Sequence, residues 1–370
     1  MNDRMESTVV GVLAFHELDE FGQPTGRSAT FEGGEIQPLR YEDLEKIKLD
    51  GPILIPLRVT GARVVESNYP DLPIAMEGTV NAPLESHYAS KAIGLVRGGW
   101  LPSGLALREG MVVLPDRCTI KDLAARYWDG VKRLTGDDFL DIFQGKAVRI
   151  NPGLFAMEGN ERGIPTPEQV ADQWAEAKRK VLDALPDAQI VPDAAVQGVI
   201  GLVSDMRSSF DRQVEFLCQV APKLQSPVSA SRRPEAWHWV LEMAQKCGLT
   251  RGSLVVLAAL STVVVVKGAS PAKRIIKPSA KYSKADAYNA LADLRALELL
   301  MRLYAAFPDE KVMLCTGDKN LALFWAGIRG SGFTREGMIT RYTLSPVQAL
   351  LQKVTPNLME AYFAPEMKGH

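Results

Sequence analysis

Two aspartates follow short apolar runs that have the composition of buried strands. Asp116 comes directly after "MVVLP", and Asp318 comes after "VMLCTG". If both runs are parallel strands of one sheet, their carboxyl ends lie at the same edge, where ligand-binding and catalytic groups gather. A buried strand that ends on a bare carboxylate needs a partner for its charge. We favour a divalent metal ion held by several such acids.

Further acidic residues are candidates for the same site. Glu158 follows the apolar run "LFAM", and Asp286, Asn289 and Asp293 are spaced so that they share one face of a helix. Mg²⁺ and Mn²⁺ prefer oxygen ligands and commonly bind carboxylates together with a substrate phosphate. A metal-bound water is a better nucleophile at neutral pH, and the metal stabilises the charge that develops at phosphorus. The acids therefore predict metal-dependent phosphodiester hydrolysis.

Each of these acids also has a structural interpretation. Asp318 taken alone is equally well explained as a helix N-cap. Asp286 could favour a helix N-terminus through the helix dipole, and Glu158 could lie in an exposed turn. No single position is specific for a metal site, so the prediction depends on the order and context of the acids.

A basic segment, "KGASPAKRIIKPSAKYSK", leads into the helix that carries Asp293 and contains no acid. Its cations are Lys267, Lys273, Arg274, Lys277, Lys281 and Lys284. Positive charge beside a group of acids suits a nucleic-acid backbone, so we expect the four from Lys273 to Lys281 to bind substrate. Asn289 is expected to donate to phosphate or to a carboxylate, and Thr316 to support the site with its hydroxyl. The alternative is a solvated loop.

Composition limits the class of protein. The chain has 370 residues, is 46% hydrophobic and carries a net charge of −1, so it can bury a large core but has no overall attraction for nucleic acid. Its four cysteines are isolated, which argues against a zinc site and favours a reduced compartment. The longest apolar run, 254–266, is too short to span a bilayer, and the N-terminus makes a poor signal peptide. We expect a cytoplasmic protein without a membrane partner.

The elements that must position these residues form two regions. Residues 1–108 contain short β-like runs between Gly-, Pro- and Asp-rich turns and are predicted to be a β-rich N-terminal region. In residues 109–370 strands alternate with helices, which predicts an α/β domain with a parallel sheet flanked by helices on both faces.

Local signals place several helices and strands. We expect helices that begin after N-caps at Thr119, Thr166 and Ser283, and one that ends near Gly248. A strand at 312–315 is expected to lead through the Asp318 loop into a helix at 319–327. Residues 254–266 are compatible with a buried helix or strand, and a last strand and helix are expected within 337–354.

The order Asp116, Glu158, Asp293, Asp318 resembles that of the PIN-domain nucleases. "VVLPDRCTI" resembles the first strand of that family, which ends in an Asp and enters a helix. "TGDKNLA" resembles its fourth acidic motif, "NALADLRAL" its third, and "FAMEGNE" its second. The resemblance covers about residues 110–345. It implies a PIN-like fold, a carboxylate-bound Mg²⁺ or Mn²⁺, and endoribonuclease activity that uses all four acids as catalytic residues. Asp116, Asp293 and Asp318 would bind the metal, with Asp286 as a substitute for Asp293.

The chain departs from the family pattern in two ways. Cys118 stands where the family usually has an Asn, and the gap from Glu158 to Asp293 implies a helical insertion at about 165–250. Three functions therefore remain open: a metal-dependent ribonuclease, a scaffold that keeps the fold without chemistry, and a DNA-directed nuclease. The expected partner is RNA, with DNA as the alternative. The β-rich region would help to bind substrate, pair protomers or restrain the nuclease, and a homo-oligomer or a regulatory partner is a further expectation.

Overall fold

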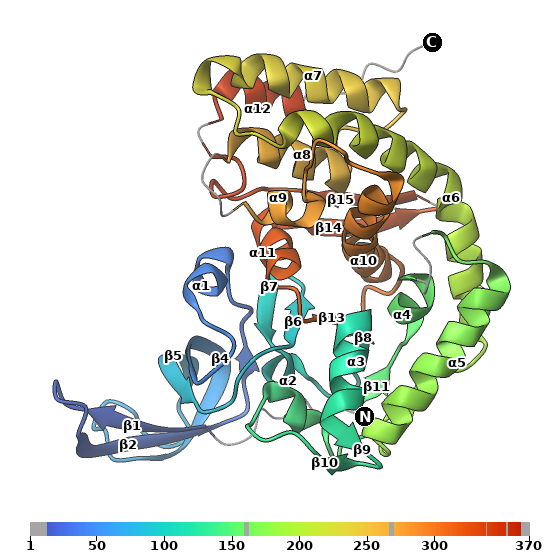
Figure 1. Cartoon of the computed structure of the whole chain (residues 1–370). Helices are drawn as coiled ribbons and strands as arrows, with labels where there is room; N and C mark the ends of the chain where they lie inside the picture. Colours follow the sequence, from blue (N-terminus) through green and yellow to red (C-terminus); the bar gives the residue numbers. More distant parts are fainter. Residues whose placement is uncertain (1–12, 159–162, 266–269, 338, 353, 364–370) are drawn as a thin grey trace.

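The computed structural model describes residues 13–158, 163–265, 270–337, 339–352 and 354–363. An N-terminal sheet projects from an α/β body that carries a group of helices at its far end (Figure 1). Residues 1–12, on which the signal-peptide argument rests, lie outside the described residues. Within the described residues no helix combines the length and apolar character needed to cross a membrane.

The N-terminal sheet is antiparallel and is organised around one long strand. Its strands are β1 (Leu13–Leu18), β2 (Pro24–Glu32), β3 (Glu35–Ile36), β4 (Ile53–Ser67) and β5 (Glu77–Ser86). β4 pairs with β2, β3 and β5, and buried side chains alternate with more exposed ones along it. This alternation is what a sheet with one covered face requires. A short helix, α1 (Tyr41–Lys46), follows β3 and packs on α11 (Lys319–Ile328) of the body.

The central sheet has the strand order β12-β11-β8-β13-β6-β7. Its strands are β6 (Ile93–Val96), β7 (Gly99–Pro102), β8 (Val112–Pro115), β11 (Arg149–Ile150), β12 (Gln189–Ile190) and β13 (Val312–Thr316). The first four strands in the spatial order are parallel, whereas β6 is antiparallel to β13 and β7 is antiparallel to β6. The α/β class is confirmed, but the sheet is mixed where we expected a parallel one.

The antiparallel part of this sheet comes from the region predicted as a separate β-rich segment. Residues 93–102 form the hairpin β6–β7, and every residue of both strands is buried. Trp325 of α11 donates its indole N–H to the carbonyls of Val96 and Gly99, at 3.0 and 2.9 Å. The hairpin is thus covered by a helix that lies more than 200 residues away in sequence, a contact that no local pattern reveals.

The described helices and 3-10 turns lie around the central sheet and beyond it. They are α2 (Ser103–Ala106), α3 (Arg117–Arg126), η1 (Phe139–Phe143), α4 (Gly153–Glu158), α5 (Pro167–Ala184), α6 (Ala195–Val220), η2 (Ala221–Leu224), η3 (Ala230–Arg232), α7 (Arg233–Lys246), α8 (Leu254–Val264), α9 (Pro271–Ile276), α10 (Lys284–Ala306), α11 and α12 (Pro356–Phe363). The predicted caps at Thr166 and Ser283 are confirmed, each as part of a capping box. Gly248 has φ +65° just after α7, as expected for a helix end. The region 165–250 holds α5, α6, α7 and also β12.

Two local predictions were wrong. Asp116, not Thr119, is the N-cap of α3, because its carboxylate accepts the backbone N–H of Thr119 at 2.6 Å. Residues 344–352 form an irregular segment with turns rather than a helix, and α12 begins only after Thr355. The preceding strand, β15 (Ile339–Thr343), is confirmed and pairs antiparallel with β14 (Ser331–Glu336). The apolar run at 254–264 is a helix that is buried along its whole length.

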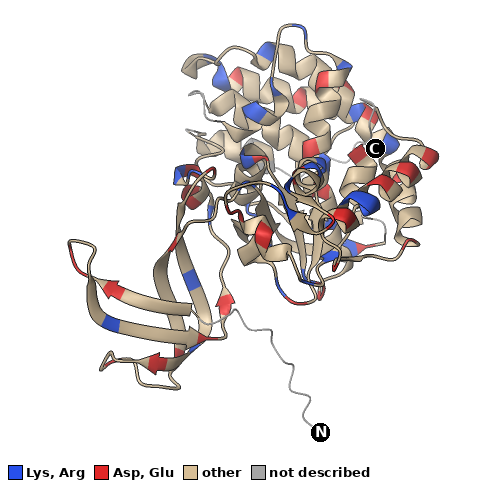
Figure 2. Cartoon of the chain, turned by 60° about the horizontal axis from the view of Figure 1, so that its bottom comes forward, with Lys and Arg blue, Asp and Glu red and all other residues tan. Residues whose placement is uncertain are grey.

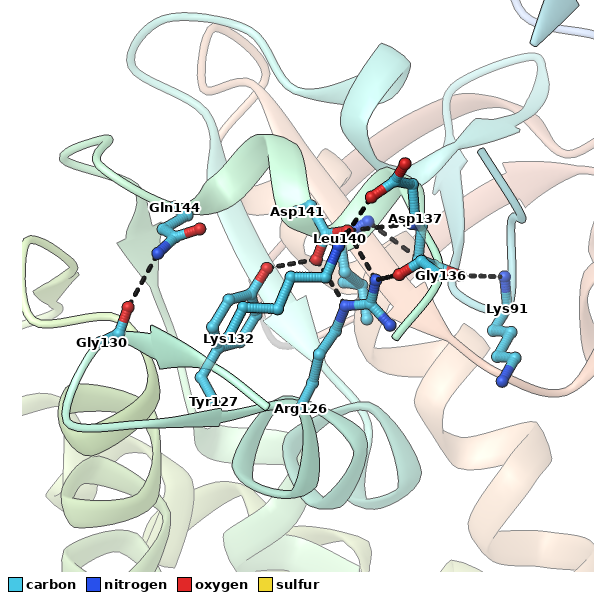
Figure 3. A network of polar contacts seen from close by, with 11 residues as sticks. Lys91, Arg126, Tyr127, Gly130, Lys132, Gly136, Asp137, Leu140, Asp141 and Gln144 are labelled. Atoms are coloured by element: carbon cyan, nitrogen blue, oxygen red, sulfur yellow. Dashed lines mark hydrogen bonds and ion pairs between the residues drawn. The ribbon is translucent and has the colours of Figure 1, made fainter. Parts of the chain in front are cut away.

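A network of charged groups fixes the far end of α3 (Figure 3). Arg126 and Tyr127 both donate to the Asp141 carboxylate, and Lys132 Nζ donates to it at 2.8 Å. Burial alone would raise the pKa of Asp141, but these bonds outweigh it and hold the pKa well below its usual range. The network joins α3 to the hairpin β9 (Tyr127–Trp128) and β10 (Val131–Lys132) and to η1. It therefore anchors the helix that carries Asp116 at its other end.

Candidate functional site

The centre of the sheet is a point where the strand order reverses. The chain passes from β8 to β11 and β12 on one side, and later returns to β13 on the other side of β8. In open α/β sheets, ligands bind outside the carboxyl ends of the strands at such a point. Asp116 follows the carboxyl end of β8, and Asp318 lies two residues after β13.

Both aspartates are held by hydrogen bonds at helix N-termini. Asp318 caps α11, and its Oδ1 accepts the backbone N–H groups of Asn320 at 2.6 Å and Leu321 at 3.1 Å. The buried Thr316 hydroxyl accepts the backbone N–H of Asp318 at 3.0 Å and donates to the Asp116 carboxylate. A single hydroxyl thus connects the two acidic positions. The expectation that Thr316 supports this site agrees with these contacts, although Thr316 is buried and cannot itself reach solvent.

Two helices from distant parts of the chain bring the other acids. α4 ends at Glu158, and α10 carries Asp293. Tyr288 of α10 donates its hydroxyl to the backbone carbonyl of Glu158, and Arg295 Nη2 donates to the carbonyl of Met157 at 2.8 Å. These bonds fasten the end of α4 to α10 and so fix the backbone that carries Glu158.

Asp116, Glu158, Asp293 and Asp318 line one pocket of about 90 Å³. All four side chains are half-buried. Arg117, Cys118 and Arg295 line the same pocket. The four acids predicted to be catalytic therefore come together from the ends of β8 and β13 and from two separate helices.

Burial raises the pKa values of Asp116, Glu158 and Asp293, and neighbouring acids add to the effect at Glu158 and Asp293. Burial raises the pKa of Asp293 to about 8, and the charges of Asp318 and Glu158 act in the same direction. Burial also raises the pKa of Glu158, assisted by Asp116 and opposed by Arg117. The pKa of Asp116 is raised by burial too, against the hydrogen bonds from Thr316 and Thr119. The pocket thus concentrates negative charge that water does not fully screen.

Other predicted site residues lie outside this pocket. Asp286 belongs to the capping box of α10, where its Oδ2 accepts the backbone N–H of Ser283 at 2.8 Å and the Ser283 hydroxyl at 2.7 Å. Asp293 lies seven positions after Asp286, about 10 Å further along the helix axis. Asn289 is exposed and does not line the pocket. The structure therefore places Asp293, and not Asp286, with the other acids.

The basic segment has mixed surroundings. Lys273 Nζ donates to the carbonyl of Gln225 at 2.9 Å, whereas Arg274, Lys277 and Lys281 are exposed. Lys277 follows α9 in the left-handed conformation, and its charge opposes the rise in the pKa of Asp293. Lys267 lies outside the described residues. In the ribbon of Figure 2, positions of Lys and Arg alternate with positions of Asp and Glu along the described part of the chain.

Tyr288 and Arg295 were not recognised from the sequence as part of this site. Both are buried residues of α10, and Arg295 also stacks over the ring of Phe210, 5.2 Å from its centroid. The sequence contains one signal that could have identified them. Tyr288 and Arg295 are seven positions apart, so they lie on one helix face, and buried leucines lie on that face too. Because an arginine on such a face is rarely buried without partners, it indicates a specific contact.

The donor atoms fit a hard divalent cation, but they do not form a closed cage. Among the described residues, no group of three or more His, Cys, Asp and Glu side chains is placed so that it could hold a metal ion. Asp293 nevertheless makes no hydrogen bond or ion pair with any residue in the described ranges, although it is half-buried and surrounded by acids. Such a carboxylate suits a cation that keeps several waters and needs only one or two direct protein ligands.

No protein-family model, curated protein or solved structure matches the chain. Function must therefore be argued from the site itself.

Proposed function

We propose that the protein is a metal-dependent nuclease of the PIN-like type, most readily an endoribonuclease that hydrolyses phosphodiester bonds. One observation carries the proposal: four carboxylates from four separate segments line a single pocket at the carboxyl ends of β8 and β13. Burial and neighbouring acids raise the pKa values of Asp293 and Glu158, and a bound cation would offset this cost.

In this proposal Asp116, Asp293 and Asp318 hold Mg²⁺ or Mn²⁺, directly or through water, and Glu158 completes the set. The cation would supply an activated water and stabilise charge at phosphorus. Thr316 donates to the Asp116 carboxylate and accepts the backbone N–H of Asp318, so it orients the first acid and fixes the backbone of the second. Asp293, which holds a proton near neutral pH in the metal-free chain, would release it when the cation binds.

RNA is the proposed substrate, and a metal-dependent DNA nuclease is the alternative within the same chemistry. The exposed Arg274, Lys277 and Lys281 precede α10 and would bind backbone phosphates. Cleavage of an RNA oligonucleotide compared with its 2′-deoxy counterpart would separate the two, because only the RNA presents 2′-hydroxyl groups.

A binding or scaffold protein is the second candidate, and a specific observation favours it. Asp116 and Asp318 both cap helices, which gives each acid a structural reason to be present. The described acids also lack the arrangement of a preformed metal cluster. A scaffold of this kind would keep the caps and need no cation.

Metal binding is expected to raise the melting temperature of the wild-type chain. We expect an increase of several degrees on replacing EDTA with excess Mg²⁺ or Mn²⁺, because a ligand that binds only the folded state stabilises it. The double variant Asp116→Asn/Asp318→Asn should lose this increase but keep its fold, since Asn caps helices about as well as Asp. Asp211→Asn, an exposed change on α6, is the matched control and should keep it. A melt that is insensitive to metal in the wild type would favour the scaffold.

Neutralising the exposed cations is expected to weaken RNA binding and to flatten its salt dependence. In the triple variant Arg274→Gln/Lys277→Gln/Lys281→Gln, each lost phosphate contact should reduce the slope of log K against log salt by about 0.7 for single strands. Lys273 is left intact because it bonds to Gln225. Fluorescence anisotropy at several salt concentrations measures the slope.

The matched control for that experiment removes the same charge elsewhere. Lys146, Arg207 and Lys246 are exposed residues of other segments, and their replacement by Gln changes the net charge equally. If this control reduces the slope as much as the variant does, the basic segment has no special role in binding.

A further inference from the structure

A larger cavity lies at the amino ends of β8 and β13, whereas the acidic pocket lies at their carboxyl ends. It encloses about 560 Å³ between the N-terminal sheet, at Ile36 and Gly61, and the body of the molecule. Met111, just before β8, and Val312, the first residue of β13, both line it. The acidic pocket is at the other ends of these strands, roughly 15 Å away at 3.3 Å per residue. The cavity is therefore a separate site.

Arg108 lines this cavity, and its guanidinium is hydrogen-bonded to backbone carbonyls but has no carboxylate partner among the described residues. Its Nη1 donates to the carbonyl of Leu105 at 2.8 Å, and its Nη2 donates to the carbonyl of Ile36 at 2.9 Å. The side chain is half-buried, and no carboxylate of the described chain lies within ion-pair distance. Exposed Glu35 acts on it only at longer range. Burial lowers the pKa of Arg108, and Glu35 opposes that shift.

A second arginine of the cavity is held in the same way. Arg97 Nη2 donates to the carbonyls of Tyr304 at 2.9 Å and Pro308 at 3.2 Å, and the guanidinium lies 4.8 Å from the centroid of the Tyr304 ring. Among the described residues it too has no carboxylate partner at ion-pair distance. Three described acids also line the cavity, Glu35, Asp309 and Glu310, and of these Glu310 is paired with Arg149 at 3.5 Å. The two guanidiniums are therefore held by neutral carbonyls, and each keeps N–H groups that could bind an anion inside the cavity.

The wall combines an apolar part with polar residues, among them Thr60 and Lys311. Ile36, Leu101, Ala106 and Met111 are buried residues that line the cavity. A volume of this size lies within the range of small-molecule sites, about 300–1,000 Å³, which combine apolar walls with a few fixed polar groups. A guanidinium can bind a carboxylate or a phosphate through two parallel hydrogen bonds, and two of the five Arg108 N–H groups suffice for its present bonds.

We propose that this cavity binds a small molecule in which one anionic group, a carboxylate or a phosphate, is joined to an apolar ring system. Arg108 pairs with the anion, Arg97 adds a second positive charge, and the apolar wall contacts the rings. The proposal does not depend on the nuclease function, because no residue of the acidic pocket takes part.

The test uses three naphthalene probes that differ only in the attached group. 1-Naphthylacetate and 1-naphthyl phosphate carry the two anions, and 1-naphthylacetamide is the neutral control. Fluorescence titration of the full chain should detect binding of at least one anion, and the amide should bind at least tenfold more weakly. Arg108→Gln should weaken anion binding at least tenfold, whereas Asp318→Asn, at the other edge of the sheet, should leave it unchanged. The preferred anion identifies the ligand class.

A second measurement uses only the wild-type chain, so it does not depend on whether a variant folds. Hydrogen exchange of the backbone amides is compared with and without the probe. The bound probe should protect backbone amides in residues 34–38 and 105–111, which flank the cavity. The proposal is overturned if neither anion binds at millimolar concentration, if the amide binds as well as the anions, if Arg108→Gln binds as the wild type does, or if protection falls only elsewhere.

Discussion

Asp318→Asn is expected to reduce the rate of RNA cleavage at least about a thousandfold, which corresponds to about 4 kcal/mol of transition-state stabilisation. The substitution removes the negative charge that would hold the cation. The Asn carbonyl oxygen can still accept the N–H groups of Asn320 and Leu321 that Oδ1 accepts now. Because Asn and Asp are similar as N-caps, α11 should form as before.

Single-turnover cleavage of a labelled RNA in the presence of Mn²⁺ measures this effect, with circular dichroism and a thermal melt to verify the fold. Asp318→Ala separates the two roles of the residue, since it should lose activity and, in addition, about 1 kcal/mol of stability with the cap. Asp211→Asn on the exposed side of α6 should cleave as the wild type does. An Asp318→Asn enzyme with full activity would refute the metal site at this pocket.

The strands and helices next to the acids were predictable because their signals are local. "MVVLP" and "VMLCT" are short buried runs, and the residues that follow them are suited to start helices. Parallel strands with helical connections place their carboxyl ends at one edge, so the proximity of Asp116 and Asp318 follows from the class of fold. The helical spacing that includes Asp286 and Asp293 was also visible, but it could not decide between them. The tertiary contacts of α10, among them its hydrogen bonds to the end of α4, decide that Asp293 reaches the pocket.

Contacts between distant segments were not predictable in this way. The hairpin at residues 93–102 has the composition of a β-rich region, and nothing in it identifies β13 as its partner. Thr119 was predicted to be an N-cap from its residue type. The cap is set by the side-chain oxygen that accepts a backbone N–H of the first turn, and that oxygen belongs to Asp116. The cavity beside Arg108 likewise depends on how the N-terminal sheet sits against the body, which no motif encodes.

Removing the charge of Asp293 is expected to stabilise the metal-free chain increasingly as the pH rises. In the unfolded chain an Asp loses its proton near pH 4, whereas in the folded chain Asp293 keeps its proton up to about pH 8. Between these values the folded state binds more protons, so the contribution of Asp293 to the stability of the wild type falls as the pH rises. Asp293→Asn cannot lose a proton and escapes this penalty. Its stability relative to the wild type should therefore increase from pH 5 to pH 8.

The increase should exceed about 1 kcal/mol, because each unit of pKa shift corresponds to about 1.4 kcal/mol. Urea denaturation at pH 5 and at pH 8, both in EDTA, measures it as the difference between variant and wild type, which cancels the other titrating groups. Asp211→Asn is the control and should give the same difference at both pH values, since that side chain is exposed. Saturating Mn²⁺ should abolish the advantage of Asp293→Asn at pH 8, because the cation favours the ionised carboxylate in the folded state. A difference that does not change with pH would show that Asp293 is already ionised in the pocket, and the pocket would then have no electrostatic need for a cation.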